Sequence, residues 1–149
     1  MTSDTISVER TIAATPDRIF ALISDAGKHS SIDGSGTVVG TAQESEPLAL
    51  GTTFGMSMHR GVGYKTSNKV IEFEQDRRIA WQTTGLGGIV GGRIWRYELS
   101  PTDGGTLVRE TWDVSKDKQK FFLKRSKMAP AAKVGMRKTL ERIAESLEA

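Results

Sequence analysis

The chain has 149 residues, the size of one domain and too few for two. With 37% hydrophobic and 26% charged residues it can bury a core and stay soluble, which excludes a low-complexity disordered chain. Its net charge is only +3, it has no cysteine for disulfides, thiolate catalysis or zinc, and no apolar run approaches the ~18 residues of a membrane span. Two histidines argue against a histidine-rich metal site, and the first residues lack the pattern of a secretory signal. We therefore expect one cytoplasmic domain over 1–149, without metal or cofactor.

The N-terminal part of the chain predicts a strand followed by short helical segments. Apolar residues at alternate positions predict a half-buried strand over 4–12. Thr15, Pro16 and Asp17 have the chemistry of an N-cap, a first-turn proline and a first-turn acid, and therefore predict a short helix. Residues 29–36 are rich in Ser, Gly and Asp, which is typical of a turn, with room for one helical turn before it.

The middle of the chain predicts consecutive strands, and the end predicts a helix. The six further strands span roughly 36–41, 51–59, 63–74, 78–84, 92–100 and 106–114. After residue 117 the apolar period becomes helical, and Pro130 fits only the first turn of a helix over about 130–147. This order of elements is α+β, and only the C-terminal helix is long enough to cover the sheet. We therefore predict a curved antiparallel sheet of about seven strands wrapped around that helix, with short helices after the first strand.

The last hairpin has the clearest register. Asp103-Gly104 is a strong signal for a two-residue turn. If these residues form the loop, the facing pairs are Leu99 with Val108, Tyr97 with Glu110, and Trp95 with Trp112. A slip of one residue would place one strand's side chains on the other face, so the match of apolar with apolar residues favours this register. Ile94, Arg96 and Glu98 then lie on the opposite face.

The same alternation in the other strands predicts an inner face rich in Trp, Met, Phe and Tyr. Large polarizable side chains with a few polar groups are typical of a ligand cavity, although aromatic and methionine stripes also fill solid cores. Both interpretations stay open at this point. The candidate ligand-binding residues are Phe54, Met56, Met58, Trp81, Thr83, Trp95, Tyr97, Glu110, Trp112 and Met136.

Glu110 is the unusual member of this set. A carboxylate on a buried face costs roughly several kcal/mol unless it is paired or protonated. Arg93 and the lysines of the last helix are its candidate ion-pair partners. The alternative is catalysis, in which Glu110 and Tyr97 would transfer protons inside a dry cavity.

Common catalytic motifs do not occur. The glycine-rich run 85–92 lacks the Lys and Ser/Thr of a phosphate loop and fails the dinucleotide pattern, so we interpret it as a flexible loop that serves as a lid. His29 falls in a predicted loop and His59 is predicted to point outward, so neither has an evident nucleophile partner.

Several segments together resemble a known superfamily. They are residues 32–38 (IDGSGTV), 70–81 (VIEFEQDRRIAW), 97–108 (YELSPTDGGTLV) and the closing helix. The chain resembles, over essentially its whole length, the polyketide cyclase/dehydrase-like branch of the START-like (SRPBCC, helix-grip) superfamily. The resemblance implies a deep, mostly apolar cavity between the sheet and the C-terminal helix. Because that superfamily holds lipid carriers, hormone receptors and cyclases and shares no catalytic motif, the resemblance assigns no catalytic residue here.

Three functions are compatible with the sequence. The first is binding of a small hydrophobic or aromatic ligand, such as a lipid or a polyketide-like compound, with tryptophan walls and with Tyr97 and Glu110 orienting a polar group. The second is a cyclase or dehydrase that acts on a polyketide-like substrate without a metal.

The third is an interaction protein that uses a basic C-terminal segment. Residues 116–142 hold ten Lys or Arg and two acids, a balance of +8 that leaves −5 for the rest of the chain. Phe121 and Phe122 would either insert into a partner or cover one end of the cavity. A homodimer and a protein partner, as in toxin–antitoxin pairs, stay open, whereas the lack of exposed interleaved aromatics argues against RNA. The basic residues concerned are Lys118, Lys120, Lys124, Arg125, Lys127, Arg137 and Lys138.

Overall fold

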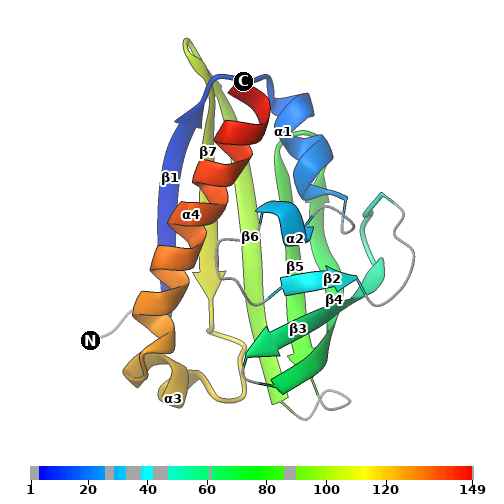
Figure 1. Ribbon diagram of the computed structural model, residues 1–149, viewed down its shortest axis with the longest axis vertical. Coiled ribbons are helices and arrows are strands. Elements are labelled where there is room, and N and C mark those ends of the chain that lie inside the picture. The colour runs from blue at the N-terminus through cyan, green and yellow to red at the C-terminus, as the bar shows by residue number, and fades with distance from the viewer. Residues whose placement is uncertain are drawn as a thin grey trace.

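A single antiparallel sheet forms most of the fold, with its inner face turned toward the C-terminal helix (Figure 1). The computed structural model describes residues 4–25, 29–32, 38–41, 47–60, 62–85 and 90–148, with backbone only at 30–31, 38–41, 56–60 and 62–64. The strands are β1 (Thr5–Ile12), β2 (Val38–Thr41), β3 (Thr53–Arg60), β4 (Val62–Glu74), β5 (Arg78–Gly85), β6 (Val90–Thr102) and β7 (Gly105–Asp113). Their order in the sheet is β1-β7-β6-β5-β4-β3-β2, so each strand after β2 pairs with the next and β1 closes the edge beside β7.

Four helices lie within the described residues, and together with the sheet they confirm the α+β prediction. They are α1 (Pro16–Ile23), α2 (His29–Ile32), α3 (Lys120–Arg125) and α4 (Met128–Glu148). Pro130 is the third residue of α4 and therefore lies in its first turn, as its missing N–H requires. The turn predicted at 29–36 begins as the helical turn α2, and residues 33–37 lie outside the described part of the chain.

The start of α1 differs in one detail from the sequence prediction. Thr15 occupies the N-cap position with extended backbone, and Pro16 follows as the first helical residue. The Thr15 side chain does not cap the helix. Its hydroxyl instead forms a hydrogen bond with Asp17, which lowers the pKa of that carboxyl.

The pairing of β6 with β7 confirms the predicted hairpin register. Tyr97 faces Glu110 and Trp95 faces Trp112. Gly105 holds the hairpin close to the neighbouring strand: its φ is +137°, and a Cβ there would lie 2.1 Å from the carbonyl oxygen of Ile12. Only glycine tolerates this close approach, so the residue after the turn also sets the pairing of β7 with β1.

The core lies between the inner face of the sheet and the helices α1 and α4. The stripe Met136, Leu140 and Ile143 of α4 is buried, as the sequence predicts. Glu148 accepts a hydrogen bond from the Ala13 backbone N–H at 2.8 Å, which ties the end of α4 to the turn after β1. The long helix is therefore fixed to the sheet along its length, with its first turns next to α3 (Figure 1).

The glycine-rich run is shorter as a loop than the sequence suggests. β5 extends to Gly85 and β6 begins at Val90, so only 86–89 lie between them, outside the described residues, and the predicted lid falls mainly there. Gly91 and Gly92 are strand residues. The Lys118 N–H donates to the Gly91 carbonyl at 2.9 Å, and a Cβ at Gly92 would lie 2.6 Å from the carbonyl oxygen of Lys116. These glycines let the segment before α3 cross directly over the start of β6.

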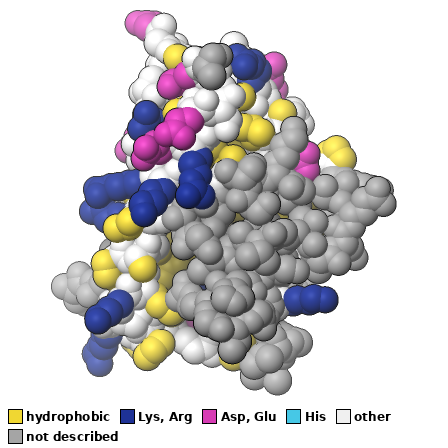
Figure 2. Space-filling view, in the orientation of Figure 1, with side chains coloured by type: hydrophobic (Ala, Val, Ile, Leu, Met, Phe, Trp, Pro, Cys, Tyr) yellow, Lys and Arg dark blue, Asp and Glu magenta, His cyan; other side chains and the backbone are white. Residues whose placement is uncertain are grey.

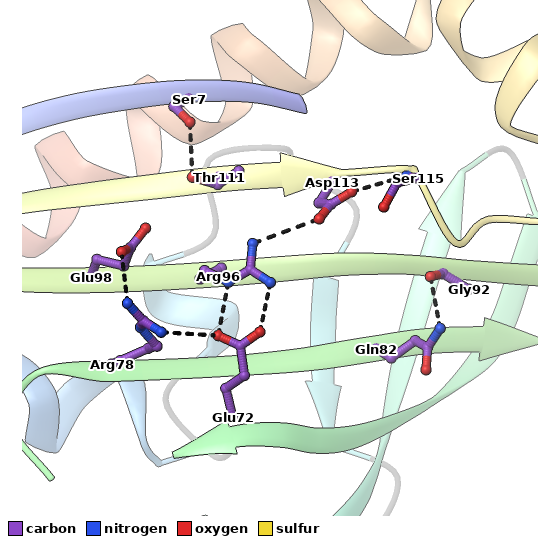
Figure 3. A network of polar contacts seen from close by, with 10 residues as sticks. All are labelled: Ser7, Glu72, Arg78, Gln82, Gly92, Arg96, Glu98, Thr111, Asp113 and Ser115. Carbon is purple, nitrogen blue, oxygen red and sulfur yellow. Dashed lines mark hydrogen bonds and ion pairs between the residues drawn. The ribbon is translucent and has the colours of Figure 1, made fainter. Parts of the chain in front are cut away.

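The outer face of the sheet carries a charged network (Figure 3). Arg96 of β6 donates two hydrogen bonds, at 2.9 and 2.6 Å, to the Glu72 carboxylate on β4. It also lies 3.6 Å from Asp113, and Arg78 lies 3.3 Å from Glu98. The bond from Arg96 lowers the pKa of Glu72, and Glu72 in turn raises that of Arg96. The predicted outward direction of Arg96 and Glu98 is thus confirmed.

Candidate functional site: the inner aromatic face

The three tryptophans of the chain form one row across β5, β6 and β7. Trp81 faces Trp95, and Trp95 faces Trp112, so all three project from the same side of the sheet. Trp81 and Trp112 are buried, whereas Trp95 is only partly buried against the core. Because the chain has no other tryptophan, its indole fluorescence reports on this row alone.

Trp81 is the centre of an aromatic cluster. Its ring packs edge-on against Phe54 of β3, with centroids 5.6 Å apart, and lies tilted against Tyr97 of β6 at 5.7 Å. The ring of His29 stacks on it with a centroid distance of 5.0 Å and an interplanar angle of 21°. The structure therefore brings two predicted lining residues, Phe54 and Tyr97, against a third, Trp81, and adds the ring of His29 to them.

His29 is the residue that the sequence interpretation missed. It is not a loop residue: it begins α2, is 5% exposed, and contacts Phe54 as well as Trp81. Its Nε2 lies 2.7 Å from the Ile23 carbonyl oxygen, and since a carbonyl only accepts, this nitrogen is the protonated one. One weak signal in the sequence pointed to its burial: His29 and Ile32 are three residues apart, a spacing that places both on one face of a helix, and Ile32 is also buried.

A polar corner lies beside Phe54. Thr83, a predicted lining residue, is half-buried and donates its hydroxyl hydrogen to Asn68 Oδ1 at 2.7 Å. Asn68 is 2% exposed, and its amide donates to the Phe54 carbonyl at 3.2 Å. Asn68 is missing from the candidate residues predicted from the sequence, because an amide side chain in a strand is usually expected to face the solvent.

Glu110 lies where the hairpin register placed it, on the inner face. It is 3% exposed, with Tyr97 opposite it on β6 and Val8 opposite it on β1. Arg93, one of its candidate partners, is engaged elsewhere: Arg93 Nε donates to Asp117 Oδ2 at 3.2 Å, and the Asp117 side chain is fully buried. The inner face thus carries a carboxyl, a phenol and an imidazole among apolar rings.

The remaining candidate residues lie outside the aromatic cluster or outside what the structure describes. Met136 is 1% exposed on α4 and belongs to the buried core. The side chains of Met56 and Met58 lie outside what the structure describes, as does that of His59. Phe121 and Phe122 are 69% and 68% exposed, so the expectation that they cover one end of a cavity is wrong.

Within the described residues, no three histidine or carboxylate side chains gather as metal ligands. None of the described helices is both long and apolar enough to cross a membrane.

Comparison with known proteins places the chain in a family. A family model described as polyketide cyclase/dehydrase and lipid transport matches residues 3–148. The uncharacterized protein Rv0088 of Mycobacterium tuberculosis is 32% identical over 106 residues, which is 68% of this chain and 44% of that protein. The match therefore spans less than half the length of these curated relatives.

Solved structures share the fold at low sequence identity. Protein CV1439 of Chromobacterium violaceum is 16% identical with a TM-score of 0.76, and the match covers 98% of both chains. The Aha1 dimer of Colwellia psychrerythraea is 16% identical with a TM-score of 0.68, covering 97% of this chain and 96% of that one. DynU16, a protein of the dynemicin biosynthetic locus, is 18% identical with a TM-score of 0.70, and the match covers 99% of this chain and 48% of DynU16.

Proposed function

The chain belongs to the polyketide cyclase/dehydrase and lipid-transport family, and from this premise we propose that it binds a small hydrophobic or aromatic ligand against the inner aromatic face. The observation that carries the proposal is the cluster around Trp81, in which His29, Phe54 and Tyr97 contact one indole. Apolar rings with a few polar groups at their edges are typical of ligand sites.

The chemistry of the cluster defines the class of ligand. Flat rings bind other flat rings by offset stacking and edge contacts, and bind hydrocarbon chains by dispersion. His29, Tyr97 and Glu110 supply polar atoms on the same face, which would orient a hydroxyl, carbonyl or carboxyl group of the ligand. Trp95 is the partly buried member of the tryptophan row and the one that offers apolar surface for contact. A polyketide-like ring system or a lipid with one polar end fits this arrangement.

Tryptophan fluorescence tests the proposal directly, because every tryptophan lies in the row. We expect a saturable change in emission on titration with at least one of a fatty acid, a sterol and a polycyclic aromatic polyketide. Trp95→Ala should abolish most of the response, whereas Leu50→Ala, which truncates a side chain that is 66% exposed elsewhere, should leave it intact. No saturable response with any of the three ligand classes would contradict the proposal.

His29→Leu separates the polar from the apolar part of recognition. Leucine keeps much of the volume packed against Trp81 but has no ring nitrogen. We expect ligands with a polar end to bind more weakly, by about tenfold for one lost hydrogen bond, while hydrocarbon ligands without a polar group bind as before. Equal loss for both kinds of ligand would mean that His29 serves packing alone.

A second candidate function is catalysis of cyclisation or dehydration. It rests on one observation, the burial of Glu110 on the inner face directly opposite Tyr97. Under this proposal the carboxyl and the phenol move protons to and from a substrate held against the tryptophans. Glu110→Gln should then abolish turnover of a polyketide-like substrate and leave its binding largely unchanged. Loss of binding and folding together would instead assign Glu110 a structural role.

A further inference from the structure

The surface of α3 carries two adjacent phenylalanines that the packing of the helix does not require. Phe121 and Phe122 are adjacent and both more than two thirds exposed, while Leu123 beside them is buried and holds the helix to the core. Adjacent exposed aromatic side chains that are surrounded by polar residues are a common feature of interaction sites. The two rings are therefore unused by the fold.

Positive charge surrounds these two rings. Lys116, Lys118, Arg125 and Lys127 are exposed and Lys120 is half-buried, with its Nζ 5.3 Å from the centre of the Phe121 ring. The one acid in the segment, Asp117, is fully buried against Arg93, so it does not offset these charges at the surface. Figure 2 shows dark blue and yellow side chains next to one another at the lower left, over α3 and the first turns of α4.

The charges of α4 are placed against the preference of a helix. The N-terminal end of a helix favours acids and its C-terminal end favours bases, yet α4 has no acid in its first turn and no base in its last. Lys133, Arg137 and Lys138 lie in its first half, and its three acids all lie in the second half. In α3, by contrast, Lys124 and Arg125 lie in the last turn, where bases are favoured. The stability of α4 does not explain its arrangement of charges, whereas attraction of an anionic partner does.

The segment is also held firmly in place. Lys124 Nζ donates to Asp4 Oδ1 at 2.8 Å, the Gly91 N–H donates to Gln119 Oε1 at 2.9 Å, and Gln119 N–H donates to Asp117 Oδ1 at 2.8 Å. These bonds tie α3 to the start of β1 and to the start of β6. The two phenylalanines are therefore presented from a fixed base and lose little freedom when they insert into a partner.

We propose that α3 and the first turns of α4 form a docking surface for an anionic lipid membrane, with Phe121 and Phe122 inserting among the lipids and the surrounding Lys and Arg binding the headgroups. Aromatic side chains beside basic residues are the composition that interfacial membrane anchors use. The docking surface is defined as the exposed side chains of residues 116–138, none of which is a tryptophan or one of the rings around Trp81. Binding to a membrane through this surface does not require the proposed ligand.

Vesicle sedimentation with the full chain tests this proposal. We expect binding to phosphatidylcholine vesicles that contain a third phosphatidylserine, little binding to pure phosphatidylcholine, and loss of binding as salt rises. The double variant Phe121→Ala/Phe122→Ala should bind at least about tenfold more weakly. The triple variant Lys120→Gln/Arg125→Gln/Lys127→Gln should bind about a hundredfold more weakly, from roughly a fivefold loss for each cation.

Matched controls carry the same chemical changes elsewhere on the surface. Leu50→Ala truncates another exposed apolar side chain, and Lys65→Gln/Lys69→Gln/Arg77→Gln removes three exposed charges on β4 and the turn after it. Both should bind within about twofold of the parent chain, since neither touches the docking surface.

Three results would overturn the proposal. They are equal binding to neutral and anionic vesicles, full binding by the double phenylalanine variant, and tighter binding of duplex DNA that the phenylalanine changes do not affect. The tryptophan response to a ligand should be the same in the double variant as in the parent chain. The two proposals can therefore fail separately.

Discussion

The inner and outer faces of β5 and β6 differ completely, although their residues alternate along the same strands. On the inner face, Trp81 sits among three other rings, and its neighbour Trp95 keeps some accessible surface. On the outer face, one residue away, Arg96 lies in a network of carboxylates above the buried Ala80. The outer contacts are short, directional and fixed by register, whereas the inner contacts are broad and can be shared with a ligand. The outer face therefore holds the strands in register, and the inner face is the one to which we assign ligand binding.

The largest effect that separates the two faces should come from Trp81→Ala. The change removes a buried indole that contacts three rings, so we expect a loss of about 3–5 kcal/mol in the free energy of unfolding. Urea unfolding followed by circular dichroism measures it without relying on the deleted fluorophore. A loss below about 1 kcal/mol would mean that the space around Trp81 is loosely filled.

A smaller effect is expected on the outer face, from Arg96→Met. Methionine keeps the apolar stem but removes the two bonds to Glu72 and the contact with Asp113, and the partly buried site predicts a loss of about 1–2 kcal/mol. Arg109→Met is the matched control. Its pair with Glu9 is about half exposed on both sides, so its loss should stay below about 1 kcal/mol. Equal losses would show that the network adds nothing beyond a surface pair.

The smallest expected effect is a change in pH dependence in Glu72→Gln. The bond from Arg96 lowers the pKa of Glu72 in the folded chain, so its contribution to stability is present above the ordinary carboxyl range. That contribution is lost as the pH falls below about 4–5. The parent chain should be more stable than the variant at pH 7, and the difference should shrink toward pH 3. Urea midpoints at several pH values measure this, and a difference that is constant with pH would contradict the assignment.

The architecture and the hairpin register could be predicted from sequence because local signals and global packing agree. Asp103-Gly104 indicated one turn, the alternation of apolar and polar residues indicated which side chains share a face of the sheet, and only one helix was long enough to cover it. The strand bulges at 70–72 and 83–84 had no comparable signal, since they arise from pairing between strands. The sequence predicts Gly91 as a loop residue and Gly92 at the border between that loop and a strand, because glycine marks turns and close backbone approach alike. Only the segment that crosses over them distinguishes the two.

The candidate site was predicted only in part. Phe54, Trp81 and Tyr97 followed from alternation along regular strands. His29 did not, because its position depends on where α2 folds over the sheet, a tertiary contact with no periodicity in the sequence. The sequence left open whether Phe121 and Phe122 insert into a partner or cover one end of a cavity, and in the structure Leu123 takes the inward position of α3. In a six-residue helix a small rotation decides which apolar side chain is buried, and sequence spacing cannot fix it.

The most direct test of the account is native mass spectrometry of the purified chain, first alone and then after incubation with a fatty acid, a sterol and a polycyclic aromatic compound. If the inner aromatic face binds an apolar ligand, one of these conditions should give a complex of one ligand per chain, and Trp95→Ala should weaken it while Leu50→Ala should not. The mass of the bare chain under every condition would contradict the account, and the inner face would then be a solid core.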